Sequence, residues 1–135
     1  MATLKPSAKA TETVEYLETL LRQVDHFAAL VEQFAGAQKG SEMYASQVSR
    51  QLSQLRQKAM MRNLGFIADA AGQLSVVASR GGNPMMKGRM LRDGVVSFRA
   101  LIERTIKATV TADESVQKEK AFLAEKAARA SKAEA

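Results

Sequence analysis

The sequence contains no cysteine and no tryptophan, and only two prolines. Without cysteine the chain has neither a disulfide nor a thiolate ligand for a metal ion. No segment alternates apolar and polar residues over the length of a strand, so we expect no sheet. No apolar run approaches the ~20 residues of a membrane-spanning helix, and residues 1–10 lack the apolar segment of a secretory signal. These absences favour a cytoplasmic all-α protein without a membrane span.

Candidates for catalysis are missing as well. The only histidine is His26, and Gln23 stands where the Glu-x-x-His motif of a carboxylate-bridged metal site needs a glutamate. A single histidine without a distinctive serine context also excludes the usual nucleophilic triads. Gly81-Gly82-Asn83-Pro84 has the spacing of neither a P-loop nor a dinucleotide fingerprint. We therefore predict no enzymatic activity, no catalytic or metal-binding residue and no cofactor.

Alanine, leucine, glutamine, lysine and glutamate are abundant, and all of them favour helices. Between Val14 and Phe34 apolar residues recur at steps of three and four, which places them on one face of a helix. We predict this helix over residues 11–35, opened by Thr11 and ended near Gly36. His26 lies on the polar face, and we interpret it as a solvated side chain rather than a phosphoryl acceptor.

The next segment can form one helix or two. Apolar residues from Val48 to Val77 keep one helical phase through Asn63-Leu64-Gly65, which a chain reversal has no reason to preserve. That phase favours a single helix over residues 42–80. Two glycines in its interior and the Asn-Leu-Gly sequence, a typical helix stop, favour two helices instead.

Ser79-Arg80-Gly81-Gly82-Asn83-Pro84 separates this segment from the last one. The glycines end a helix, Asn83 is suited to cap the next one, and Pro84 suits its first position. Apolar residues from Leu91 to Ile106 then return at helical spacing. We predict a helix here, followed by a tail that is either its continuation or frayed.

The predicted fold is an elongated antiparallel bundle of three long helices, or four if the second breaks near Asn63–Gly65. Residues 1–10 are a flexible lead, residues 11–112 the bundle, and residues 113–135 a tail rich in Ala, Lys and Glu. The predicted core consists of Val14, Leu17, Leu21, Val24, Phe27, Val31, Phe34, Leu52, Leu55, Phe66, Leu74, Val77, Leu91, Val95, Phe98 and Ile102.

Two surfaces are candidates for binding. The formal net charge is +6, and a candidate basic face opposite the apolar stripe of the last helix consists of Arg89, Arg92, Arg99, Arg104 and Lys107. No aromatic residues interleave with these cations to stack on bases, which favours a solvated face over a nucleic-acid site. Methionine suits adaptable partner contacts as well as core filling; the candidate contacts are Met60, Met61, Met85 and Met86.

One stretch resembles a known family. Leu55-Arg56-Gln57-Lys58-Ala59 with Asn63-Leu64-Gly65 resembles histidine phosphotransfer domains, which are helical bundles with a His-x-x-Lys-Gly motif and an Asn-hydrophobic-Gly turn. The lysine, the asparagine and the last glycine match. Leu55 stands where the family has its histidine, and Gln57 where it has an apolar residue. The resemblance implies a phosphotransfer-like adaptor without a phospho-accepting histidine.

Three functional hypotheses follow. The leading one is a non-enzymatic interaction or assembly protein that self-associates, because a first helix shorter than its neighbours leaves apolar helix faces uncovered. Its partner is then a second copy or another helical protein. The second is a binder of nucleic acid or of an acidic protein through the basic face. The third is the phosphotransfer-like adaptor.

Overall fold

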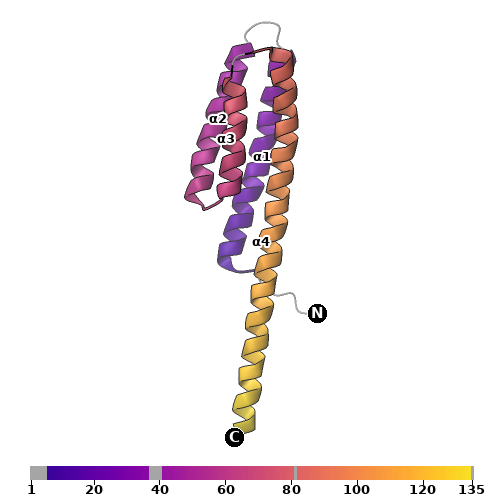
Figure 1. The fold of residues 1–135 in the computed structure, drawn as a ribbon. Helices are drawn as coiled ribbons and strands as arrows, with labels where there is room; N and C mark the ends of the chain where they lie inside the picture. Colours follow the sequence, from indigo (N-terminus) through magenta and orange to yellow (C-terminus); the bar gives the residue numbers. More distant parts are fainter. Residues whose placement is uncertain (1–5, 37–40, 81, 135) are drawn as a thin grey trace. The chain divides into compact units, whose positions relative to one another are not determined.

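The computed structural model describes residues 6–36, 41–80 and 82–134, and over this part of the chain the fold is all-α, as predicted (Figure 1). Two compact units are present: unit 1 consists of Met1–Glu18 with Arg104–Ala135, and unit 2 of Thr19–Glu103. The described residues form four helices and no strand; the helices are α1 (Ala8–Gly36), α2 (Ser41–Met61), α3 (Gly65–Ser79) and α4 (Pro84–Glu134).

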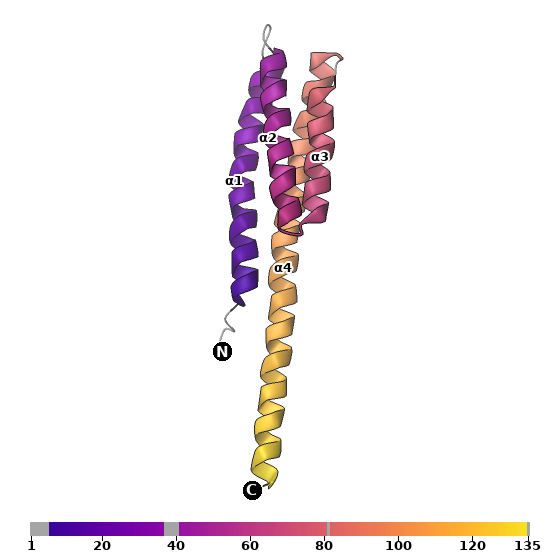
Figure 2. The same ribbon diagram turned by 90° about the vertical axis from the view of Figure 1, so that its left-hand side faces the viewer.

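Within unit 2 the helices pack as an antiparallel four-helix bundle (Figures 1 and 2). α2 and α3 form a hairpin in which the Ser75 hydroxyl donates to the carbonyl oxygen of Ser49 at 3.2 Å and lies 3.0 Å from the Ser53 hydroxyl. α3 also contacts α4 closely, since Leu74 packs directly against Gly94. A Cβ atom there would collide with a terminal methyl group of the leucine side chain, which would have to move.

Of the two alternatives for residues 42–80, the favoured single helix is wrong and the break near Asn63–Gly65 is confirmed, because the chain reverses between α2 and α3. Asn63 adopts a left-handed conformation with φ 59°, which asparagine tolerates better than most residues. The Leu64 N–H then donates to the carbonyl oxygen of Ala59 at 2.9 Å and closes the helix end. The reversal lets α2 and α3 bury their apolar faces against each other, which one straight helix cannot do.

Most of the predicted core positions are buried, with one clear exception. The buried ones are Leu17, Val24, Phe27, Val31, Phe34, Leu52, Leu55, Leu74, Leu91, Phe98 and Ile102. The half-buried ones are Val14, Leu21, Val77 and Val95. Phe66 is 84 % exposed, so its predicted core position is wrong. The turn at Asn63 resets the helical phase, and Ile67 and Ala68 are buried in place of Phe66.

The helix ends differ from the prediction at the start of α1. The Ser7 hydroxyl accepts the N–H of Ala10 at 3.1 Å and caps a helix that begins at Ala8, so residues 8–10 belong to α1 rather than to a lead. Residues 1–5 of the predicted lead and 37–40 of the predicted loop lie outside the described residues.

The start of α4 agrees with the prediction, and the helix extends through the predicted tail. Asn83 caps α4, because its Oδ1 accepts the N–H of Met85 at 2.9 Å, and Pro84 is the first residue of the helix. α4 continues to Glu134 without a break. The predicted tail is therefore helical and continuous with the helix that precedes it.

Candidate interaction surfaces

The five residues of the predicted basic face fall into different units. Arg89, Arg92 and Arg99 belong to the part of α4 in unit 2, whereas Arg104 and Lys107 belong to unit 1. Arg89, Arg92, Arg104 and Lys107 are exposed, and Arg99 is half-buried.

Within unit 2, two of these arginines are engaged by carboxylates of α1. Arg92 donates from Nε and Nη2 to the two carboxylate oxygens of Glu32, each at 2.7 Å. Arg99 forms an ion pair with Asp25. The hydrogen bonds and the charge of Arg92 lower the pKa of Glu32 below its ordinary value. These pairs join α1 to α4 and offset two of the positive charges that the helical pattern assigned to a free face.

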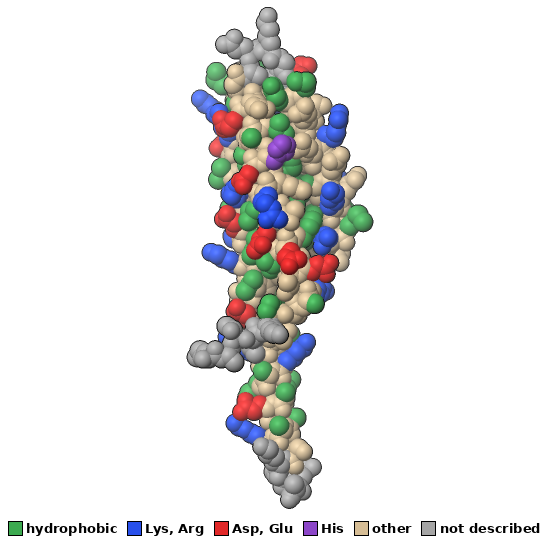
Figure 3. Space-filling view, turned by 180° about the vertical axis from the view of Figure 1, so that it is seen from behind, with side chains coloured by type: hydrophobic (Ala, Val, Ile, Leu, Met, Phe, Trp, Pro, Cys, Tyr) green, Lys and Arg blue, Asp and Glu red, His purple; other side chains and the backbone are tan. Residues whose placement is uncertain are grey.

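A second basic feature of unit 2 was not found from the sequence. A groove of about 460 Å³ lies between α1 and α2, and three of its lining residues are Arg22, His26 and Lys58. The others are Thr19, Gln23, Phe27, Gln51, Gln54 and Leu55, so none of the described lining residues is a carboxylate. Figure 3 shows the histidine exposed on this surface, with hydrophobic, acidic and basic side chains nearby. We call this feature the cationic groove.

Sequence periodicity could not reveal the cationic groove, because its cations come from two helices whose register depends on packing. Arg22 and His26 are four residues apart on α1 and share a face. Lys58 comes from α2. Leu55, at the position of the phosphotransfer histidine, is only 3 % exposed, so the structure presents no phospho-accepting side chain there.

Another groove of about 460 Å³ in unit 2 has mixed charge. Arg50, Arg80 and Lys87 line it together with Glu42. Lys87 is already engaged, since its Nζ donates to the carbonyl oxygen of Arg80 at 2.6 Å. The same Nζ lies 5.6 Å from the centroid of the Phe34 ring. This groove therefore offers less free positive charge than the cationic groove.

The methionines singled out in the sequence are on the surface rather than in the core. Met60 and Met61, at the end of α2, are 57 % and 84 % exposed. Met85 and Met86, in the first turn of α4, are 69 % and 64 % exposed. Core filling therefore does not explain them, and partner contact stays a prediction.

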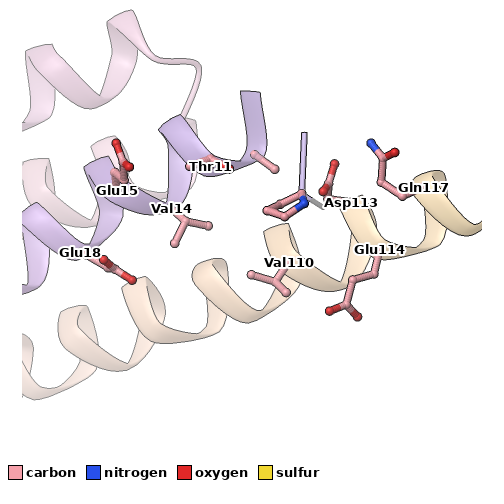
Figure 4. A pocket seen from close by; sticks show the side chains of 10 residues that line it. Thr11, Val14, Glu15, Glu18, Val110, Asp113, Glu114 and Gln117 are labelled. Carbon is pink, nitrogen blue, oxygen red and sulfur yellow. The ribbon is translucent and has the colours of Figure 1, made fainter. Parts of the chain in front are cut away.

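Unit 1 contains an apolar groove with an acidic surround (Figure 4). The groove has a volume of about 360 Å³ between the start of α1 and α4, and Val14 and Val110 line it together with four carboxylates. One of these is held in place, because Ser7 donates to Asp113 from its backbone N–H at 3.0 Å and from its hydroxyl at 2.8 Å. These hydrogen bonds lower the pKa of Asp113 below its ordinary value.

Among the described residues of unit 1, no element covers the C-terminal part of α4. Every residue from 118 to 131 is exposed, and Figure 2 shows α4 continuing past the start of α1. Phe122 and Leu123 are 64 % and 54 % exposed, and Val116, just before them, is 46 % exposed. We call residues 118–131 the free segment of α4.

Two kinds of site are not found in the described part of the chain. It contains no group of three or more histidine, cysteine or acidic side chains placed to hold a metal ion. None of its helices combines the length and the apolar character that crossing a bilayer requires. Comparison with known proteins adds no further constraint: no protein-family model, curated protein or solved structure matches the chain.

Proposed function

We propose that this chain is a non-enzymatic helical interaction protein that self-associates through apolar side chains exposed on its helices. The observation that supports this is the number of large apolar side chains left in water. They are Met43, Met60, Met61, Phe66, Val76, Met85, Met86, Met90, Val96, Val110, Val116, Phe122 and Leu123. Large apolar side chains that are exposed on helices are commonly buried against another subunit where they lie together.

The kind of side chain supports the same proposal. Six of these residues are methionines, whose flexible thioether side chains adapt to a partner's shape. Phe66 and Met61, on either side of the α2–α3 turn, are each 84 % exposed. Nothing in the packing of unit 2 requires large apolar groups at such exposed positions, whereas an interface uses them as anchors.

The mass of the full chain in solution tests the proposal. Sedimentation equilibrium across a range of concentrations should show a species heavier than the 14.7 kDa protomer that dissociates on dilution. Burial of apolar surface should make the association persist when salt screens charges. A strict monomer at tens of micromolar protein would contradict self-association.

The cationic groove supports a second candidate function, which is binding of an acidic protein segment. Arg22, Lys58 and a histidine line it, and none of its described lining residues is a carboxylate, so its field favours negative charge. Lys58→Glu should abolish binding of an acidic peptide, while Arg99→Ala should leave it unchanged, because Arg99 is already paired with Asp25. Equal loss in both variants would indicate non-specific attraction to a basic protein. Preferential binding of duplex DNA would point to nucleic acid instead.

A further inference from the structure

The free segment of α4 exposes apolar side chains that no described element of unit 1 covers. An isolated helix of this length is marginal in water, because most helical stability in proteins comes from packing an apolar face. An apolar stripe is defined by Val116, just before the free segment, and by Leu123 and Ala130 within it, which are seven residues apart and share one side of the helix. Ala127 lies on the same side. No described residue of unit 1 covers this stripe between residues 118 and 131.

We propose that the free segments of two copies of this chain pair antiparallel, with the two-fold axis at Leu123. This inference rests on the proposed self-association and specifies its surface and orientation. The axis places Leu123 against its equivalent and Val116 opposite Ala130 of the second copy. A large residue therefore faces a small one at each end of the contact, and the largest apolar group lies at the centre.

Charges on one flank of the stripe select the antiparallel orientation. Glu119 and Lys126, seven residues apart, lie on the same flank. Equal flanks face each other in an antiparallel pair, so Glu119 of each copy meets Lys126 of the other, twice per dimer. A parallel pair in register would place each flank against the opposite flank of the other copy, so Glu119 and Lys126 would not meet and these attractive pairs would be absent. Phe122 lies beside the same flank, close to the axis.

The length of the free segment fits this register. With the axis at Leu123, the contact extends from residue 116 to residue 130. The start of α1 is held at the level of Asp113 by Ser7, outside this stretch. Within unit 1, no part of α1 therefore occupies the face that the second copy would cover. Every side chain from 118 to 131 is available to it.

Charge reversal tests both the surface and the orientation. Sedimentation equilibrium on the full chain should show that Glu119→Lys and Lys126→Glu each weaken the dimer by about tenfold, because each replaces two attractive pairs with two repulsive ones. The double variant should restore the wild-type affinity, since it exchanges the two charges. Equimolar Glu119→Lys and Lys126→Glu chains should form a mixed dimer tighter than either homodimer.

Matched controls lie on the opposite face of the free segment. Lys118→Glu and Glu125→Lys make the same changes in net charge and should leave the dimer unchanged. Leu123→Ala should dissociate it, and an unchanged unfolding transition of the protomer would show that the loss comes from the interface, because Leu123 is 54 % exposed in the protomer.

The outcomes separate this inference from the proposed function. An oligomer unaffected by all these variants overturns the pairing of α4 and leaves self-association standing. Weakening without restoration in the double variant overturns the antiparallel register. A wild-type monomer overturns both proposals, and a mixed complex with another helical protein would then be the occupant to seek.

Discussion

Arg92 of α4 and Glu32 of α1 form a two-bond ion pair, with both donor–acceptor distances at 2.7 Å. Seven residues farther along α4 and seven residues back along α1, Arg99 pairs with Asp25. The equal spacing of two turns shows that these stretches of α1 and α4 run antiparallel in one fixed register. The two pairs thus align the edges of the helices whose apolar faces form part of the core of unit 2.

The Glu32–Arg92 pair predicts an acid-dependent contribution to stability. The folded-state pKa of Glu32 lies below its ordinary value. The stabilisation by this pair is therefore complete at pH values above the ordinary pKa of glutamate, and it is lost as the pH falls through the folded-state pKa. Glu32→Gln should therefore be less stable than wild type in urea at neutral pH, with a small difference because both side chains are about half exposed. At pH values below the folded-state pKa, the free energies of unfolding of the two proteins should become equal. A difference that persists there would contradict the stabilisation assigned to the Glu32–Arg92 pair.

Adjacent leucines of α1 should differ in their importance for the core. Leu20 is only 1 % exposed, so Leu20→Ala should cost about 2–5 kcal/mol in the free energy of unfolding. Leu21 is half-buried, and Leu21→Ala should cost clearly less. Chemical denaturation of the two variants makes the comparison, and equal costs would show that α1 is rotated from the orientation described.

Gly94 and Gly88 of α4 should respond in opposite directions to alanine. A Cβ at Gly94 would collide with Leu74, so Gly94→Ala should destabilise unit 2 by about 1–3 kcal/mol despite the better helix propensity of alanine. At Gly88 the nearest atom would be the Cβ of Ala35 at 3.4 Å, an ordinary contact. Gly88→Ala should therefore stabilise by up to about 1 kcal/mol. In a Leu74→Ala background, Gly94→Ala should no longer destabilise.

Ser7 should stabilise the start of α1 and set the acidity of Asp113. Ser7→Ala removes the helix cap, for a cost of about 0.5–2 kcal/mol, and one hydrogen bond to the carboxylate. Amide exchange at residues 8–11 should become faster, and the pKa of Asp113, measured by NMR titration, should rise toward its ordinary value. Ser7→Thr is the matched control, because it keeps the hydroxyl. An unchanged pKa in the alanine variant would refute the contact.

Local sequence determined the secondary structure of much of this protein. Steps of three and four between apolar residues are a property of one helix, so the pattern from Val14 to Phe34 was sufficient to predict α1 and much of its buried face. The cap at Asn83 and the first position of Pro84 depend only on neighbouring backbone groups and were equally predictable.

Tertiary structure decided the features that depend on how two helices pack against each other. The apolar phase through Asn63 was compatible with a straight helix and with a reversal, and the outcome follows from the burial gained when α2 packs on α3. The exposure of Phe66 follows from that reversal. The cationic groove likewise could not be predicted from the sequence, because Lys58 lines the same groove as Arg22 and His26 only through the packing of α2 on α1. Helical periodicity tells which side chains share a face, whereas the register between helices is set by packing.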